Sequence, residues 1–417
     1  MDNPGQGRIF ARMEHDCDIL IVGGGLNGPA LALAAAQAGL RSTVIDALPD
    51  DTRAGDDFDG RGYALALASV RMLANLGLWE ELSEHAQPMH EIKVTDGRVG
   101  EAQVFLGLHF DSAEIEEGPM GQMVEDRYLR RALLAAMEAE PLVAQRAGET
   151  VIAQETTAEG VTVTLASGGT LTARLLVGAD GRRSGTATRA GIRRTGWGYG
   201  QTALVCAIAH EKPHEGVAHQ FFMPPGPLAI LPLPGNRSSI VWSERDDRAR
   251  AINALPDDEY LAVLRPRFGD FLGEISLAGQ RFLYPLNLTL ANSFVGERLV
   301  LVGDAAHGMH PIAGQGLNAG LRDVAALAHV LAEARKRGED IGAPDVLGRY
   351  QSWRRFDVAT LAAATDVFNR LFSSDNPLLR AGRDLGMKLV QALPEARRGF
   401  VREAAGLTGE LPELMRG

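Results

Sequence analysis

The stretch CDILIVGGGLNGPALALAAAQAGLRSTVIDA, residues 17–47, decides the fold class of this chain. Residues 18–22 form a short β-branched run that predicts a buried strand. Residues 26–38 have the Ala- and Leu-rich spacing of a helix that stops at Gly39, and residues 41–46 predict a second apolar strand. A strand, helix and strand of this length imply parallel strands joined by a right-handed crossover. We therefore expect an α/β fold built on a parallel sheet.

Glycines occupy the turn between the first strand and the helix. Gly23, Gly25 and Gly28 match the pattern G-x-G-x-x-G, which allows a tight turn and close approach of a pyrophosphate to the helix N-terminus. Asp46 ends the next strand, where its carboxylate can accept hydrogen bonds from a ribose diol. A turn shaped by packing alone is the alternative, but strand, helix and terminal acid together favour dinucleotide binding. The loop does not distinguish NAD from FAD, and since the sequence has no second such pattern, we expect one firmly held cofactor.

Composition narrows the class of protein. A length of 417 residues predicts two domains or one large elaborated domain, and 45% hydrophobic with 23% charged residues is typical of a soluble globular protein. The net charge of −11 argues against nucleic-acid binding. The two cysteines, Cys17 and Cys206, exclude a disulfide framework and a cysteine zinc site, and suit a reducing cytoplasm. The sequence shows no signal peptide and no apolar run of membrane-spanning length.

Two interleaved domains are expected, because material of the βαβ type surrounds a block of another character. From about residue 198 to residue 285, short alternating runs separated by Pro and Gly predict an antiparallel sheet. The stretch TVTLASGGTLTARLLVGADG, residues 162–181, predicts a strand pair that turns at residues 167–169. Helices are expected over 69–76, 126–139 and about 316–337. The expected division is a disordered leader (1–15), a dinucleotide-binding domain in three parts (16–98, 119–197 and 286–350), a substrate domain (99–118 and 198–285) and C-terminal helices (351–417).

The segment GDAAHGMHPIAGQGLNAG, residues 303–320, lies between a predicted buried strand and a long helix. A metal site at His307 and His310 lacks a third ligand, and a phosphate-binding loop lacks its lysine. A nucleophile elbow needs Ser or Cys between the glycines, where this chain has Gln315. A cofactor loop fits better, since Asp304 can bind a polyol hydroxyl while backbone N–H groups of residues 314–318 face an electron-rich ring. Asp180, in the strand-end motif GADG, is by itself typical of a plain turn.

Three motifs together resemble those of the single-component FAD aromatic hydroxylases with the para-hydroxybenzoate hydroxylase fold. They are the glycine loop, GADG at 178–181 and GDAAH at 303–307. The stretch HPIAGQGLNAGLRD, residues 310–323, is similar to the pattern of the ubiquinone-biosynthesis hydroxylase subfamily at every fixed position. The resemblance covers essentially Asp16 to the end of the chain. It implies an FAD-binding Rossmann-like domain of the glutathione-reductase type, interleaved with an antiparallel β-sheet substrate domain and followed by C-terminal helices.

The resemblance also implies an FAD site. Its glycine loop would hold the pyrophosphate and Asp46 the adenosine ribose, although the family more often has Glu at this position. Arg61 would reach the diphosphate, Gln122 the flavin, and Asp180 both FAD and the pyridine nucleotide. Asp304 would bind the ribityl chain, and the loop after it would lie at the pyrimidine edge of the flavin. The complete expected set is Gly23, Gly25, Gly28, Asp46, Arg61, Gln122, Asp180, Asp304, Gly314, Gln315, Gly316, Leu317 and Asn318.

For the reaction, the resemblance implies that NAD(P)H reduces FAD and that O₂ then forms a flavin hydroperoxide, which hydroxylates the ring of a polyprenylated phenol in ubiquinone biosynthesis. No catalytic side chain and no metal are expected, and His307 and His310 are interpreted as loop-shaping residues. A flavoprotein oxidase or reductase, and a flavin-binding structural subunit of a quinone-biosynthesis complex, remain alternatives.

The expected location is the cytoplasm, with peripheral contact at the inner membrane as a further hypothesis. The C-terminal helices either pack on the body or present a basic amphipathic face to anionic lipid. Other ubiquinone-biosynthesis proteins are hypothetical partners.

Overall fold

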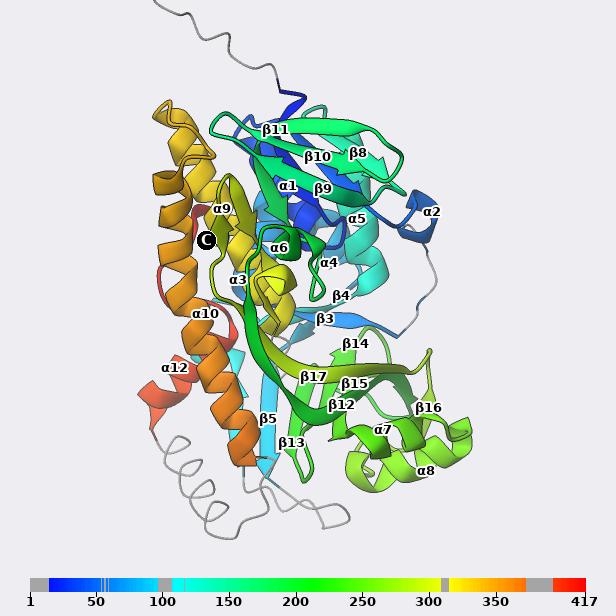
Figure 1. The fold of residues 1–417 in the computed structure, drawn as a ribbon. Helices are drawn as coiled ribbons and strands as arrows, with labels where there is room; N and C mark the ends of the chain where they lie inside the picture. The colour runs from blue at the N-terminus through cyan, green and yellow to red at the C-terminus, as the bar shows by residue number, and fades with distance from the viewer. Residues whose placement is uncertain are drawn as a thin grey trace, which may run out of the picture.

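The computed structural model describes residues 15–53, 55, 58, 60–96, 107–115, 117–308, 315–372 and 393–417. Its elements form two large sheets, one above the other in the view of Figure 1, with a small sheet between them and long helices along one side. The expected leader, apart from residue 15, and residues 373–392 of the expected C-terminal helices lie outside the described residues.

The upper sheet is parallel at its centre, as residues 17–47 predict. The central strand, Cys17–Val22, pairs with Thr170–Gly178 on one side and with Ser42–Asp46 on the other. Its Ile19, Leu20 and Ile21 are fully buried, as expected for a strand covered on both faces. An antiparallel extension turns at Gly168, which has a φ of +91°. The strand order is β18 (Val295–Gly296), β19 (Leu299–Leu301), β11 (Thr170–Gly178), β1 (Cys17–Val22), β2 (Ser42–Asp46) and β8 (Val143–Ala147), with β9 (Val151–Thr156) and β10 (Val161–Leu165) extending from β11.

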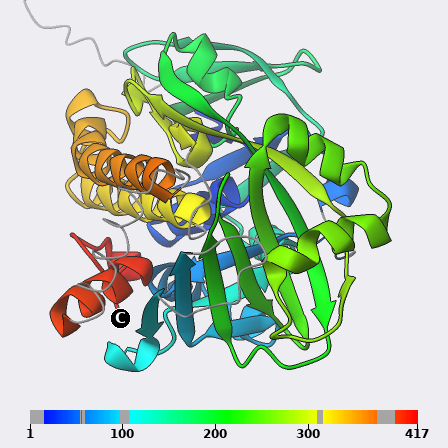
Figure 2. The same cartoon turned by 90° about the horizontal axis from the view of Figure 1, so that it is seen from below.

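Helices cover this sheet and bury its apolar residues. The Ala-rich α1 (Asn27–Gln37) packs against α9 (Gln315–Lys336) and α5 (Asp126–Ala139). Seen from below, α9 lies beside α10 (Pro344–Phe372), the long helix at the edge of the molecule (Figure 2). The shorter helices are α2 (Asp50–Arg53), α3 (Leu67–Asn75), α4 (Trp79–Ser83), α6 (Gly185–Arg189) and α12 (Pro394–Ala404), with single 3-10 turns η1 (Ser112–Glu114), η2 (Gly303–Ala305) and η4 (Glu413–Met415).

The lower sheet is antiparallel except where β13 pairs with β5. Two helices, α7 (Asp246–Asn253) and α8 (Asp257–Phe268), pack on one face of it around the fully buried Trp242 and Tyr260. The sequence predicted only sheet in this block. The strand order is β20 (His307–Gly308), β17 (Phe282–Ala291), β12 (Arg194–His210), β15 (Arg237–Arg245), β14 (Leu228–Leu233), β13 (Val217–Phe222), β5 (Glu91–Asp96) and β6 (Gly107–Asp111), with β16 (Ile275–Leu277) beside β12.

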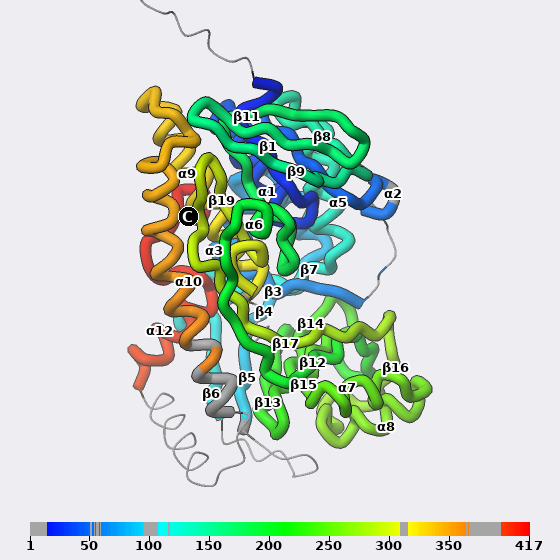
Figure 3. The backbone as a smooth tube through the Cα atoms, viewed as in Figure 1, coloured from blue at the N-terminus to red at the C-terminus, as the bar shows by residue number. Residues whose placement is uncertain are grey.

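A three-stranded sheet of β3 (Gly62–Ala66), β7 (Gly121–Glu125) and β4 (Ala86–Met89) lies between the two large sheets. Met89 and Met123 of this sheet share an apolar cluster with Ala207, Ala218 and Leu233 of the lower one. The backbone tube passes repeatedly between upper and lower layers (Figure 3). The interleaved fold expected from the sequence is thus confirmed.

The expected domain boundaries stay a prediction. Strand pairing places β5 in the lower sheet, although it falls within 16–98, and β12 and β17 each cross an expected boundary. Among the described helices, all are too short or too polar to cross a membrane.

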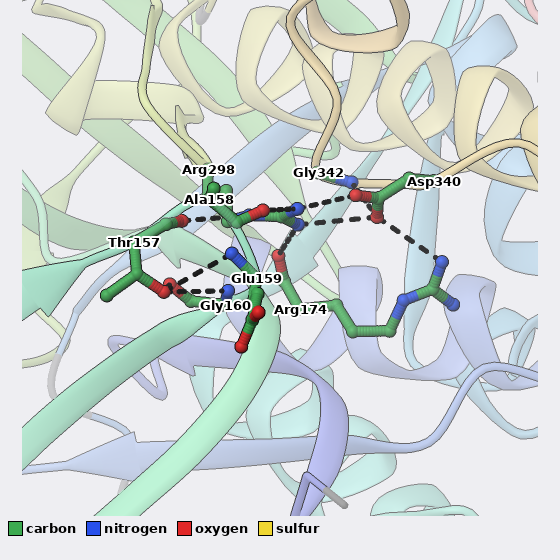
Figure 4. Close-up of polar contacts among 8 residues, drawn as sticks. All are labelled: Thr157, Ala158, Glu159, Gly160, Arg174, Arg298, Asp340 and Gly342. Carbon is green, nitrogen blue, oxygen red and sulfur yellow. Dashed lines mark hydrogen bonds and ion pairs between the residues drawn. The ribbon is translucent and has the colours of Figure 1, made fainter. Parts of the chain in front are cut away.

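A buried arginine connects four segments in and around the upper sheet through hydrogen bonds and an ion pair (Figure 4). Arg298, only 9% exposed, lies in the turn between β18 and β19 and forms a salt bridge of 2.5 Å with Asp340. Its guanidinium also donates to the carbonyls of Thr157 and Ala158 in the β9–β10 turn and to that of Arg174 in β11, at 3.0 Å for the last. One side chain therefore satisfies acceptors from turns that are far apart in the sequence.

Replacing Arg298 by methionine is expected to lower the free energy of unfolding by about 3 kcal/mol, because three carbonyls and the Asp340 carboxylate lose their charged donor. A urea titration measures the loss. Arg349→Met is the matched control: Arg349 is 33% exposed and pairs with Glu339 at 2.5 Å, so its loss should cost less than about 1 kcal/mol. Equal losses in the two variants would contradict the role assigned to Arg298.

Candidate cofactor site

Three sequence motifs meet at one edge of the upper sheet. Strands β1, β11 and β19 are parallel neighbours, so the loops that follow them lie side by side. Gly23 has a φ of +113°, and a Cβ there would lie 2.3 Å from the carbonyl oxygen of Ala179. A Cβ on Gly28 would lie 1.9 Å from the carbonyl oxygen of Gly23. Both glycines are therefore required by backbone packing between the motifs.

Asn27 connects the first motif with the third. A Cβ on Gly303 would lie 2.2 Å from the Asn27 Nδ2, and one on Gly320 would lie 2.5 Å from the same atom. Two glycines of the segment 303–320 thus make room for one side chain of the glycine loop. The Oδ1 of Asn27 is buried without a hydrogen-bond partner among the described residues.

Asp46 holds the glycine loop from the end of β2. Its Oδ2 accepts a hydrogen bond of 2.5 Å from the Gly24 N–H, and its Oδ1 accepts one of 2.8 Å from the Leu48 N–H. Arg53 lies beside it, 3% exposed, and donates to the Gly24 carbonyl at 3.3 Å. Its Nε has no hydrogen-bond partner within the described part of the chain. The sequence prediction missed Arg53, because no motif marks it.

Arg61 and Gln122 come from the small middle sheet. Arg61 precedes β3 and forms a salt bridge of 3.2 Å with the buried Asp126, while its side chain stays 34% exposed. Gln122 stands opposite Leu65 in the β3–β7 ladder. Its Oε1 is buried and has no hydrogen-bond partner among the residues described, which is the state expected of a side chain that contacts a ligand.

Asp180 is fully engaged within its own turn. Its Oδ1 accepts from the Ser184 hydroxyl at 2.5 Å, and its Oδ2 accepts from the N–H and the hydroxyl of Thr186, each at 2.9 Å. These bonds fix the turn that leads into α6. Contacts of Asp180 with FAD or a pyridine nucleotide stay a prediction.

Asp304 lies in η2, directly after β19, and its side chain is 36% exposed. Its Oδ2 accepts a hydrogen bond of 2.9 Å from the Nε of Arg182. Its backbone carbonyl accepts one of 2.6 Å from the Nη2 of Arg194, the first residue of β12. The structure thus presents Asp304 at the sheet edge and adds two arginines that the sequence prediction missed.

The N-terminus of α9 supplies the last part of the site. The Asn318 amide accepts hydrogen bonds from the Ala66 N–H and the Ser69 hydroxyl and donates one to the Ala64 carbonyl, each at 2.8 Å. With the side chain engaged, the backbone of Asn318 is the part that can face a flavin. A Cβ on Gly316 would meet no atom of the described residues within 4 Å. Leu317 packs against the main core, Gln315 begins the helix, and Gly314 lies outside the described residues.

His307 is buried, and its loop-shaping role stays a prediction. Its Nε2 lies 2.6 Å from the Oδ2 of Asp323, which also accepts from the Gly303 N–H at 2.9 Å. The Nε of Arg354 donates to the Oδ1 of Asp323 at 2.8 Å. Burial alone would raise the pKa of Asp323, but His307 and Arg354 outweigh it and hold that pKa below its usual value. Asp323 therefore anchors the GDAAH turn as a carboxylate; His310 lies outside the described residues.

These features fit a flavin dinucleotide. A Cβ on Gly25 or on Gly316 would meet no atom within 4 Å among the residues that the structure describes. Buried polar atoms of Asn27, Arg53 and Gln122 have no hydrogen-bond partner in the described part of the chain. No cluster of metal-binding side chains occurs among the described residues.

A cavity of about 560 Å³ opens between β12 and the start of α7. Four of its wall residues are charged, which does not suit an apolar tail, and we do not assign it to a substrate. Its walls are formed by Tyr199, Gly200, Gln201, Pro225, Arg245, Asp246, Asp247 and Arg250.

Comparison with known proteins shows the family of the chain. A family model described as an FAD binding domain matches residues 16–365. Ubiquinone hydroxylase UbiL of Rhodospirillum rubrum is 46% identical over 414 residues, covering 99% of this chain and 95% of that protein. The chain is a member of the FAD-binding ubiquinone hydroxylase family. FAD is its cofactor, and the resemblance stated from the sequence motifs is confirmed.

One further relative supports membership of this hydroxylase family, and one solved structure shows the fold. The 3-demethoxyubiquinol 3-hydroxylase of Escherichia coli is 36% identical, covering 94% of this chain and 98% of that protein. The crystal structure of p-nitrophenol 4-monooxygenase PnpA from Pseudomonas putida has a TM-score of 0.79 at 20% identity, covering 95% of this chain and all of that one. The second likeness shows the fold. This hydroxylase family member is therefore an FAD-dependent enzyme.

Proposed function

We propose that this chain is an FAD-dependent monooxygenase that hydroxylates the aromatic ring of a polyprenylated phenol in ubiquinone biosynthesis. The observation that carries the proposal is the 46% identity to ubiquinone hydroxylase UbiL, which extends over 99% of the chain. Bound FAD, reduced by NAD(P)H, would supply the activation of O₂ needed to insert one oxygen atom into the ring.

The chain's own residues would bind and orient the cofactor. The glycine loop, with Asp46 and Arg61, would hold the adenosine and diphosphate, and Asp304 the ribityl chain. The N-terminus of α9, at Gln315–Asn318, would place its unpaired N–H groups against the pyrimidine edge and favour the negative charge of a reduced flavin.

Apolar side chains next to α9 would keep water from the reacting ring. Leu288 of β17, Ala319 of α9 and Ala362 of α10 are buried together, with Tyr199 of β12 packed against them. An apolar environment strengthens electrostatic interactions and limits side reactions. No side chain is assigned as an acid or base.

The C-terminal helix bears on the proposed membrane contact. In α12, Arg397 pairs with Glu114 at 3.2 Å and Arg402 with Glu117 at 2.8 Å. These two arginines are engaged with the body of the protein, which leaves the exposed Arg398 and Phe400 as the part that would touch anionic lipid. A cytoplasmic location, peripheral membrane contact and association with other ubiquinone-biosynthesis proteins remain our proposals.

The direct test supplies the purified yellow protein with NADH or NADPH, isotopically labelled O₂ and a short-chain prenylphenol. We expect a product with one labelled oxygen on the ring, identified by mass spectrometry. Substrate-stimulated NAD(P)H consumption with H₂O₂ but no ring product would favour the oxidase alternative. Flavin binding without any turnover, together with support of partner enzymes, would favour a structural subunit.

Deleting the gene adds an independent readout. Cells should accumulate a quinone intermediate that lacks a ring hydroxyl, and expression of the chain should remove it. An accumulated intermediate already hydroxylated at all ring positions would contradict the proposal.

A further inference from the structure

An arginine directly after the second motif contacts the central acid of the third. The Nε of Arg182 donates to the Oδ2 of Asp304 at 2.9 Å, across 122 residues of sequence. The side chain of Arg182 runs over Gly308, where its Cγ lies 3.7 Å from the position of a Cβ. The two motifs are thus joined by an ion pair as well as by the pairing of β11 with β19.

Arg194 fixes the same two segments through their backbones. It donates to the carbonyl oxygen of Asp304 at 2.6 Å and to the carbonyl oxygen of Arg182. Because Arg194 begins β12, the lower sheet also holds the turn that carries Asp304. The backbone of this turn is therefore secured without the side chain of Arg182.

Folding stability does not account for the Arg182–Asp304 pair. The two side chains are 39% and 36% exposed, and ion pairs this open to water add little to stability. The pair is better explained by the balance of charge at the cofactor site. Arg194 also lies at this turn, but its guanidinium is bound to backbone carbonyls. Without Arg182, the Asp304 carboxylate would face a dinucleotide that carries two phosphates, and Arg182 offsets this negative charge.

We propose that Arg182 is a positioning residue for FAD: it orients the Asp304 carboxylate and offsets its charge, so that the cofactor meets a neutral pair. The inference rests on the proposed role of Asp304 at the ribityl chain. It also explains why an arginine stands at this place beside Asp180, whose own carboxylate is engaged by Ser184 and Thr186.

The test measures the dissociation constant of FAD for the apoprotein by quenching of flavin fluorescence. Arg182→Gln should weaken FAD binding roughly tenfold, the scale of one charge-assisted hydrogen bond. Arg182→Lys, which restores the charge, should recover part of the loss. Arg183→Gln is the matched control, because Arg183 is the exposed neighbour and has no role in the site; its dissociation constant should equal that of the wild type.

Two further readouts separate an electrostatic role from a merely structural one. Added salt should narrow the difference between Arg182→Gln and wild type, because it screens the repulsion between Asp304 and the phosphates. The midpoint potential of bound FAD should fall in Arg182→Gln, since reduction adds negative charge near an acid that has lost its partner. The melting temperature of the apoprotein should stay unchanged.

A double-mutant cycle shows whether Arg182 acts through Asp304. In an Asp304→Asn background, Arg182→Gln should cost much less FAD affinity than in the wild type. An undiminished cost, or equal dissociation constants for Arg182→Gln and Arg183→Gln, would overturn the inference while leaving the site assignment intact. If Asp304→Asn alone left FAD affinity unchanged, the proposed role of Asp304 itself would fail, and the inference with it.

Discussion

Gly28→Ala should yield a protein that is colourless and less stable by more than about 3 kcal/mol, because overpacking against backbone has no cheap relief. The new Cβ would lie 1.9 Å from the carbonyl oxygen of Gly23. The glycine loop and α1 would have to separate, which moves the N–H groups that face the diphosphate. Absorbance of the purified protein and a urea titration measure the two effects.

Gly25→Ala distinguishes cofactor contact from folding. A Cβ at Gly25 meets no described protein atom within 4 Å, so the variant should unfold at the wild-type urea concentration. Its FAD affinity should nevertheless fall, because the added methyl group occupies space that the dinucleotide needs. Gly399→Ala, in the exposed helix α12, should leave both properties unchanged or slightly raise stability. Normal FAD affinity in Gly28→Ala, or unfolding of Gly25→Ala, would contradict this reading of the loop.

Local patterns explain why much of the fold could be predicted from the sequence. Helix α5 occupies 126–139 as expected, and Gly39, Gly77 and Gly168 have the positive φ values of helix ends and turns. In each case the signal is contained within a few neighbouring residues. The interleaved order of sheets followed from a change in hydrophobic periodicity and from the motifs.

Contacts over long sequence distances explain what the sequence did not reveal. The parallel pairing of β5 with β13 joins segments more than 120 residues apart, and no local pattern specifies it. Asp304 was identified as a site residue, but its partner Arg182 was not. Asn318 was expected at the flavin, whereas its side chain ties α9 to β3 and α3. The sequence thus indicated which residues belong to the candidate site, but it did not indicate the residues that contact them.

Replacing Asp323 by asparagine should cause a large loss of both unfolding free energy and FAD binding. The variant leaves Arg354, 2% exposed, and His307 without their buried carboxylate. Breaking a buried pair in this way costs about 3–5 kcal/mol. FAD should also be lost at neutral pH, since the Gly303 N–H loses its charged acceptor and the turn that carries Asp304 loosens. Urea titrations and flavin absorbance at neutral pH measure both losses; Asp345→Asn, at a carboxylate 76% exposed, is the control and should change neither.

The pH dependence of the unfolding free energy tests whether the negative charge of Asp323 causes the loss of stability in Asp323→Asn. The pKa of Asp323 is lower in the folded protein than its usual value, so the unfolded chain takes up a proton at this residue first as the pH falls. The stabilisation by Asp323 is therefore complete above about pH 5, where the unfolded carboxyl is also ionised, and is lost as the pH falls through the lower folded pKa. Wild type and Asp323→Asn should accordingly converge in unfolding free energy on acidification. A difference that stayed constant down to the acid unfolding of the wild type would mean that Asp323 acts through its shape and hydrogen bonds, and that its charge does not hold the GDAAH turn.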